Sequence, residues 1–76
     1  MLNAKVNSNK KNNYKDDKEI QNKINEIEKE FSNEGRVVIR PSGTEPLVRV
    51  MIEGKDQDYI TKKAKEIAEL IENRLK

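Results

Sequence analysis

Two arginines and two hydroxyl side chains fall close together around one glycine, at Arg40, Ser42, Gly43, Thr44 and Arg49. Arginine suits phosphate because its planar guanidinium group can donate two parallel hydrogen bonds. Hydroxyl groups add donors, and a glycine with a positive φ lets successive backbone N–H groups converge on one anion. These residues therefore predict a phosphate-binding site. The alternative is a tight Pro-Gly loop with ordinary surface arginines on either side.

Composition excludes several other chemistries. The 76 residues include no cysteine and no histidine, so thiolate nucleophiles, zinc-thiolate sites and imidazole-based triads cannot be built. Asp56 and Asp58 are spaced like paired metal ligands, but a position at the start of a helix favours a capping role. Ser42 has only Glu45 nearby as a conceivable base. We therefore predict no catalytic residue and no metal site in this chain.

Hydropathy patterns predict the elements that hold this loop. Residues 2–6 alternate between apolar and polar, as a half-buried strand does. Residues 17–32 place isoleucine and phenylalanine side chains on one helical face. The stretches 36–40 and 47–53 are short and rich in β-branched residues, so each predicts a strand. A second amphipathic helix follows and runs to the end of the sequence.

The helix ends carry capping signals. Asp16 followed by Glu19 resembles a capping box at the start of the first helix, and residues 33–35 (Asn-Glu-Gly) predict its end. Asp56 or Asp58 can cap the second helix.

The predicted element order is β-α-β-β-α. Two amphipathic helices can bury their apolar faces against one face of a small, largely antiparallel sheet, so the fold class is α+β. The length supports one domain over residues 1–76, with a flexible, solvated loop at the Asn-rich residues 7–15. A core of this size supplies only about 3–5 kcal/mol, which is compatible with an incomplete enzyme or with one layer of a larger protein. The predicted core comprises Ile20, Ile24, Ile27, Phe31, Val37, Ile39, Val48, Val50, Ile52, Ile60, Ile67 and Ile71.

The two strands that flank the loop can be aligned as a hairpin. In one register, apolar residues face apolar residues and opposite charges face each other at every position but one. The exception places Arg40 opposite Arg49, where two guanidinium groups repel unless an anion lies between them. The predicted pairs are Arg36–Glu53, Val37–Ile52, Val38–Met51, Ile39–Val50 and Arg40–Arg49.

The stretch Gly35–Gly54 resembles the C-terminal phosphate-binding segment of the α-D-phosphohexomutases. The string Arg-Pro-Ser-Gly-Thr-Glu-Pro at residues 40–46 is highly specific, and the order of the flanking elements extends the resemblance over essentially the whole chain. Residues 47–54 are most similar to the branch that acts on hexosamine phosphates. The glucose and mannose branches are the alternatives.

This resemblance implies a four-domain enzyme that interconverts the 6-phosphate and 1-phosphate of a hexose through a bisphosphorylated intermediate. A phosphoserine of the first domain and a magnesium ion held by aspartates of another domain would carry the chemistry. This chain would contact the non-reacting phosphate through Arg40, Ser42, Gly43, Thr44 and Arg49, and would be inactive alone. Its partners would be a hexosamine phosphate and the other three domains of the parent chain.

Other functions fit the sequence less well. The lysines and a pI near 8.9 suggest nucleic-acid binding, but acidic residues are scattered among them and only three residues are aromatic. A P-loop nucleotide site fits even less well, because the glycine spacing differs and the loop joins strand to strand. A non-catalytic interaction domain would use Val38 and Met51 as its partner surface. No apolar run suits a membrane span or a signal peptide, so we expect a cytoplasmic protein without membrane partners.

Overall fold

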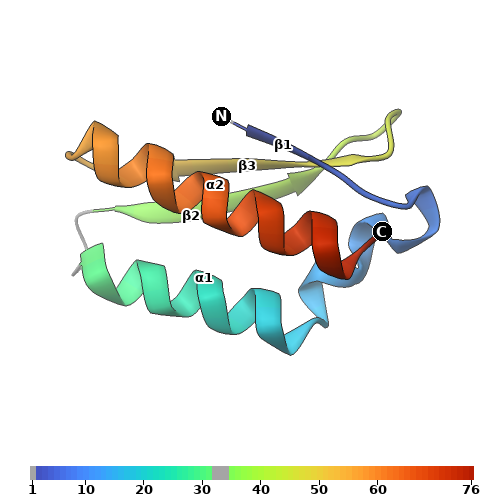
Figure 1. The fold of residues 1–76 in the computed structure, drawn as a ribbon, viewed down its shortest axis with the longest axis horizontal. Coiled ribbons are helices and arrows are strands. Elements are labelled where there is room, and N and C mark those ends of the chain that lie inside the picture. Colours follow the sequence, from blue (N-terminus) through green and yellow to red (C-terminus); the bar gives the residue numbers. More distant parts are fainter. Residues whose placement is uncertain (1, 32–34) are drawn as a thin grey trace.

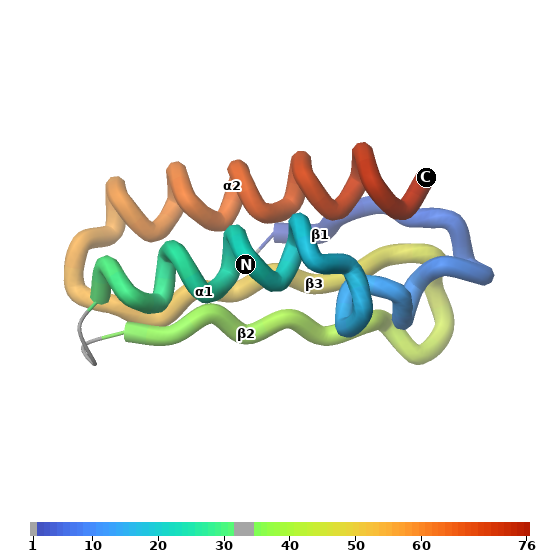
Figure 2. The backbone as a smooth tube through the Cα atoms, turned by 90° about the horizontal axis from the view of Figure 1, so that it is seen from below, coloured from blue at the N-terminus to red at the C-terminus, as the bar shows by residue number. Residues whose placement is uncertain are grey.

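The computed structural model describes residues 2–31 and 35–76. The strands form one antiparallel sheet in the order β1-β3-β2, so β3 is its central strand. The two α-helices lie side by side on one face of this sheet, and none of the described helices covers the other face (Figures 1 and 2). The predicted α+β class and element order are confirmed. The elements are β1 (Leu2–Lys5), the 3-10 helix η1 (Ser8–Lys15), α1 (Lys18–Phe31), β2 (Arg36–Pro41), β3 (Leu47–Glu53) and α2 (Gln57–Arg74).

The pairing of β2 with β3 confirms the predicted register in every pair and extends it to Pro41 and Val48. Val48, Val50 and Ile52 are buried beneath the helices, whereas Met51 on the opposite face is 37% exposed. The alternation along β3 therefore fixes which face of the sheet is covered. β1 pairs with the other side of β3 and adds Ala4 to the covered face, opposite Val48.

The core lies between the helices and the sheet, and most of its predicted members are buried. Phe31, Val37 and Ile39 are only partly buried, because β2 is an edge strand and Phe31 ends α1. Among the described residues, six further side chains are buried in the core, namely Ala4, Val6, Tyr14, Ala64, Ala68 and Leu75.

We predicted a flexible, solvated loop at the Asn-rich segment, but its conformation is regular. It is the 3-10 helix η1, which begins after Asn7, whose side chain accepts a hydrogen bond from the Asn9 N–H at 2.9 Å. Tyr14 is 9% exposed, and the Gln21 amide donates to its carbonyl oxygen at 2.8 Å. The prediction was wrong because a single aromatic side chain, which creates no periodicity, anchors this polar stretch to the core.

α1 is capped one residue later than predicted. Asp17, not Asp16, accepts hydrogen bonds from the N–H groups of Glu19 at 3.0 Å and Ile20 at 3.2 Å. Arg74 near the end of α2 donates to both carboxylate oxygens of Asp17, at 2.7 and 2.8 Å. Burial alone would raise the pKa of Asp17, but these hydrogen bonds from Arg74 and the backbone lower it below its usual value. One carboxylate thus joins the first turn of α1 to the last turn of α2.

α2 begins at one of its two predicted caps. The Asp56 side chain accepts a hydrogen bond from the Tyr59 N–H at 3.1 Å. The predicted stop signal of α1 at residues 33 and 34 lies outside the described residues. Within the part of the chain that the structure describes, no helix is both long and apolar enough to cross a membrane.

The outer edge of β2 is bonded by side chains from the helices. The Glu28 carboxylate accepts a hydrogen bond from the Val37 N–H at 3.3 Å, and the Tyr14 hydroxyl donates to the Ile39 carbonyl at 3.5 Å. Pro41, at the end of the strand, has no N–H to offer.

The edge of the sheet at β1 is bonded by the C-terminal end of α2, which lies beside it (Figure 1). The Lys5 N–H donates to the Glu72 carboxylate at 2.9 Å, and the Asn7 N–H donates to the Leu75 carbonyl at 2.7 Å. The last turn of the chain thus binds the strand with which the chain begins.

Candidate anion-binding site

Arg40 and Arg49 face each other across β2 and β3 on the uncovered face of the sheet, and both are exposed. Among residues 2–31 and 35–76, neither forms an ion pair. At the other end of the hairpin, Arg36 Nε donates to the Glu53 carboxylate at 2.9 Å, and this hydrogen bond raises the pKa of Arg36. Unbalanced positive charge therefore gathers at the loop end of the hairpin.

The arginine pair borders a surface depression of about 280 Å³, which is also lined by Arg36, Val38 and Met51. The register places Val38 and Met51 between the Arg40–Arg49 pair and the Arg36–Glu53 pair. An anion at the arginine pair would thus lie at one end of a depression with an apolar middle.

The loop between β2 and β3 is held by Ser42. Its N–H donates to the Leu47 carbonyl at 2.9 Å, which closes the loop. Its Oγ accepts hydrogen bonds from the N–H groups of Thr44 at 3.4 Å and Glu45 at 3.1 Å, and the residue is only 8% exposed. The expected convergence of backbone N–H groups does occur, but on the Ser42 oxygen. Both backbone groups are donors, and the Ser42 hydroxyl itself donates no hydrogen bond among the described residues.

Gly43 does not have the positive φ that we expected, so that part of the prediction was wrong. A Cβ added at this position would meet nothing within 4 Å. In the described ranges, the Gly43 N–H has no hydrogen-bond partner. Neither backbone strain nor crowding inside the domain therefore calls for a glycine here. Its absent side chain leaves the N–H open to approach from outside.

The N-terminal segment supports the loop. The Val6 N–H donates to the Pro46 carbonyl at 2.9 Å, and Lys11 Nζ lies 3.4 Å from the Glu45 carbonyl. Lys11 adds a cation beside the loop that sequence reasoning did not assign to the site. No local pattern could have revealed it, because 34 positions separate the two residues.

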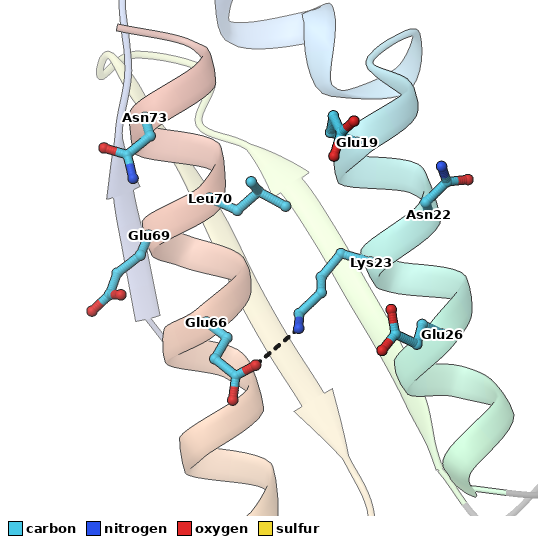
Figure 3. Close-up of a pocket in the computed structure, with 8 residues that line it drawn as sticks. All are labelled: Glu19, Asn22, Lys23, Glu26, Glu66, Glu69, Leu70 and Asn73. Carbon is cyan, nitrogen blue, oxygen red and sulfur yellow. Dashed lines mark ion pairs between the residues drawn. The ribbon is translucent and has the colours of Figure 1, made fainter.

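A second hollow of about 460 Å³ lies between α1 and α2, in the helix layer (Figure 3). Lys23 Nζ on α1 lies 2.9 Å from Glu66 Oε1 on α2. This contact lowers the pKa of Glu66 and raises that of Lys23. Among the described side chains, no group of three His, Cys, Asp or Glu is arranged to hold a metal ion. The hollow is therefore interpreted as an ion-paired seam between the helices.

A small α+β domain with two facing arginines and a hydroxyl-bearing loop has the character of an anion-binding module. Residues 1–70 match the family described as phosphoglucomutase/phosphomannomutase, C-terminal domain. The chain belongs to this family, and the resemblance drawn from residues 35–54 is confirmed.

The curated relatives include several proteins named phosphoglucosamine mutase. The protein from Finegoldia magna is 62% identical over 74 residues, which are 97% of this chain and 16% of the relative. The protein from Ruminiclostridium cellulolyticum is 61% identical over 75 residues, or 99% of this chain and 17% of the relative. The protein from Clostridium tetani is 54% identical over 76 residues, again 17% of its length. The chain thus spans about one sixth of the relatives that it matches.

Proposed function

We propose that residues 1–76 are the C-terminal, phosphate-binding domain of a phosphoglucosamine mutase. Such an enzyme would interconvert glucosamine 6-phosphate and glucosamine 1-phosphate. The family match supports the position in the parent chain, and the names of the relatives favour glucosamine over glucose or mannose. The observation that carries the proposal is the facing pair Arg40 and Arg49, which has no carboxylate partner among the described residues.

In this proposal each site residue has a defined role. Arg40 and Arg49 bind opposite sides of the substrate's non-reacting phosphate through charge-assisted hydrogen bonds. The Ser42 and Thr44 hydroxyl groups and the Gly43 N–H complete the donors on the loop side. The phosphate attracts both guanidinium groups, and these two attractions offset the repulsion between the groups. Lys11 and Ser42 Oγ keep the loop in the shape that presents these donors.

Phosphoryl transfer would use groups outside this chain. The carboxylates of the described residues do not form a set that fits magnesium, so no step is assigned to a metal held here. A phosphoserine, a magnesium ion bound by another domain and a cytoplasmic setting are predictions about the parent enzyme. The partners of this domain would be the hexosamine phosphate and the other three domains.

The expected affinity of the isolated domain is modest. Charge-assisted hydrogen bonds contribute about 1.5–3 kcal/mol each, but ordering the side chains and their exposure to water offset most of this. A dissociation constant in the millimolar range, about 4 kcal/mol, is therefore expected for inorganic phosphate. Closure of the other domains over the sugar would supply the remaining affinity.

The proposal is tested by titrating the isolated chain with inorganic phosphate and following its amide resonances. We expect the shifts to cluster at residues 40–49, to weaken with added salt and to disappear in Arg40→Ala. Arg49→Lys should retain little of the phosphate binding, because an ammonium group cannot donate two parallel hydrogen bonds. Shifts centred on residues 62–65, on the far helix layer, would indicate ordinary surface electrostatics and contradict the site. The isolated chain should not convert glucosamine 6-phosphate, and turnover would contradict the proposed division of roles.

A further inference from the structure

The depression beside the arginine pair is longer than a phosphate requires. Three residue pairs follow one another along the uncovered face of the hairpin, with Arg40–Arg49 first, Val38–Met51 second and Arg36–Glu53 third. Neighbouring pairs on one face are two residues apart along each strand, or about 7 Å. A phosphate occupies only the position of the first pair, Arg40–Arg49.

The middle pair, Val38–Met51, is apolar. Val38 is half-buried and Met51 is 37% exposed, and both face away from the two helices. Charged groups border them on both sides, since Arg40 and Arg49 lie on one side and the Arg36–Glu53 ion pair lies on the other. The face thus presents a cationic end, an apolar middle and an end with both hydrogen-bond donors and acceptors.

A phosphorylated hexose has the same order of chemical groups. Its phosphate lies at one end, its ring presents C–H groups on one side, and hydroxyl groups line the rim. We propose that this depression is a sugar subsite, in which the C–H side of the ring packs on Val38 and Met51. Arg36 and Glu53 then exchange hydrogen bonds with hydroxyl groups at the far rim. This inference rests on the proposed function, because it places the phosphate between Arg40 and Arg49.

The size of the effect follows from the apolar area covered. Covering roughly 40 Å² at about 25 cal/mol per Å² corresponds to about a five-fold gain in affinity. The sugar phosphate should therefore bind about five times more tightly than an ester of equal charge that lacks a ring.

The experiment compares two phosphate monoesters of equal charge, glucose 6-phosphate and glycerol 3-phosphate, by amide shift titration of the full chain. Val38→Thr and Met51→Gln preserve side-chain size and make the middle pair polar. Leu70→Gln is the matched control, since Leu70 is a partly buried leucine of the helix layer, in the hollow between α1 and α2. We expect the ratio of the two affinities to fall from about five to about one in the first two variants and to stay unchanged in the control.

The outcomes separate this inference from the proposed function. If both esters bind at residues 40–49 with equal affinity, the sugar subsite is wrong and the phosphate site stands. If the five-fold ratio persists in Val38→Thr and Met51→Gln, the sugar is recognised elsewhere, and the subsite is also wrong. If neither ester shifts residues 40–49, the phosphate site itself fails, and the subsite fails with it. Shifts at residues 38 and 51 only with the sugar ester would support the subsite.

Discussion

Arg49→Gln should be more stable than the unaltered chain without phosphate and less stable than the unaltered chain with phosphate. Like charges directly opposite each other on a sheet destabilise it by about 0.2–1 kcal/mol. Arg49 has no carboxylate partner among the described residues, so Arg49→Gln removes a repulsion and breaks no ion pair. In chloride buffer the variant should therefore be more stable than the unaltered chain by about 0.5 kcal/mol, or about 2–4 °C in melting temperature.

Phosphate should invert this order. With a dissociation constant near 1 mM, phosphate at about 10 mM stabilises the unaltered chain by about 1.4 kcal/mol through binding to the folded state. That corresponds to a rise of about 6–11 °C for a domain of this size. Arg49→Gln should gain much less, because the second side of the site is missing.

Thermal unfolding at matched ionic strength, in chloride and in phosphate, measures both effects. Lys62→Gln is the control: it removes the same charge from an exposed position of α2 and should keep the full phosphate response. Equal stabilisation of Arg49→Gln and the unaltered chain would refute the site. A loss of stability in chloride would refute the repulsion argument, since it would mean that Arg49 holds the hairpin together.

Three further predictions concern local features. Gly35→Ala should cost about 1–3 kcal/mol in chemical denaturation, because its Cβ would collide with the Glu53 carbonyl and lie 2.9 Å from a ring carbon of Phe31; unchanged stability would show that this packing yields easily. Gly43→Ala should leave stability within about 0.5 kcal/mol, since its Cβ meets nothing within 4 Å, while weakening the amide shifts that phosphate causes. Asp17→Ala should cost about 1–2 kcal/mol at pH 7 through loss of the α1 cap. Because the pKa of Asp17 is lowered in the folded state, this difference should be fully present above about pH 5 and shrink as the pH falls below about 4, and a constant difference would contradict the assignment.

The hairpin could be predicted from the sequence because its constraints agree with one another. Charge pairing at Arg36 and Glu53, together with the apolar runs at residues 37–39 and 50–52, favours one register, and the structure has that register. The opposed position of Arg40 and Arg49 follows from it. The functional assignment of these arginines is still a proposal, since a register shows which residues face each other and not what binds between them.

The predictions were wrong where a long-range contact or a single side chain determines the local structure. The capping-box spacing of Asp16 and Glu19 favoured Asp16, but Asp17 is the cap and also accepts hydrogen bonds from the distant Arg74. Tyr14 is one aromatic residue in a polar stretch, and its burial depends on contacts with α1 and β2. The loop was predicted to direct its N–H groups at a ligand, but the nearby Ser42 oxygen accepts hydrogen bonds from two of these groups.

The bonded edges of the sheet have a consequence for how such a domain can coexist with a much longer polypeptide. Exposed strand edges recruit other strands, which leads to swapped or aggregated chains while a large protein folds. Here Glu28 and Tyr14 occupy groups on one edge, and Glu72 and the last turn of α2 occupy groups on the other. The same contacts that complete the fold therefore protect it from mispairing. A module with edges bonded in this way can be tethered to other folding segments at high local concentration without exchanging strands with them.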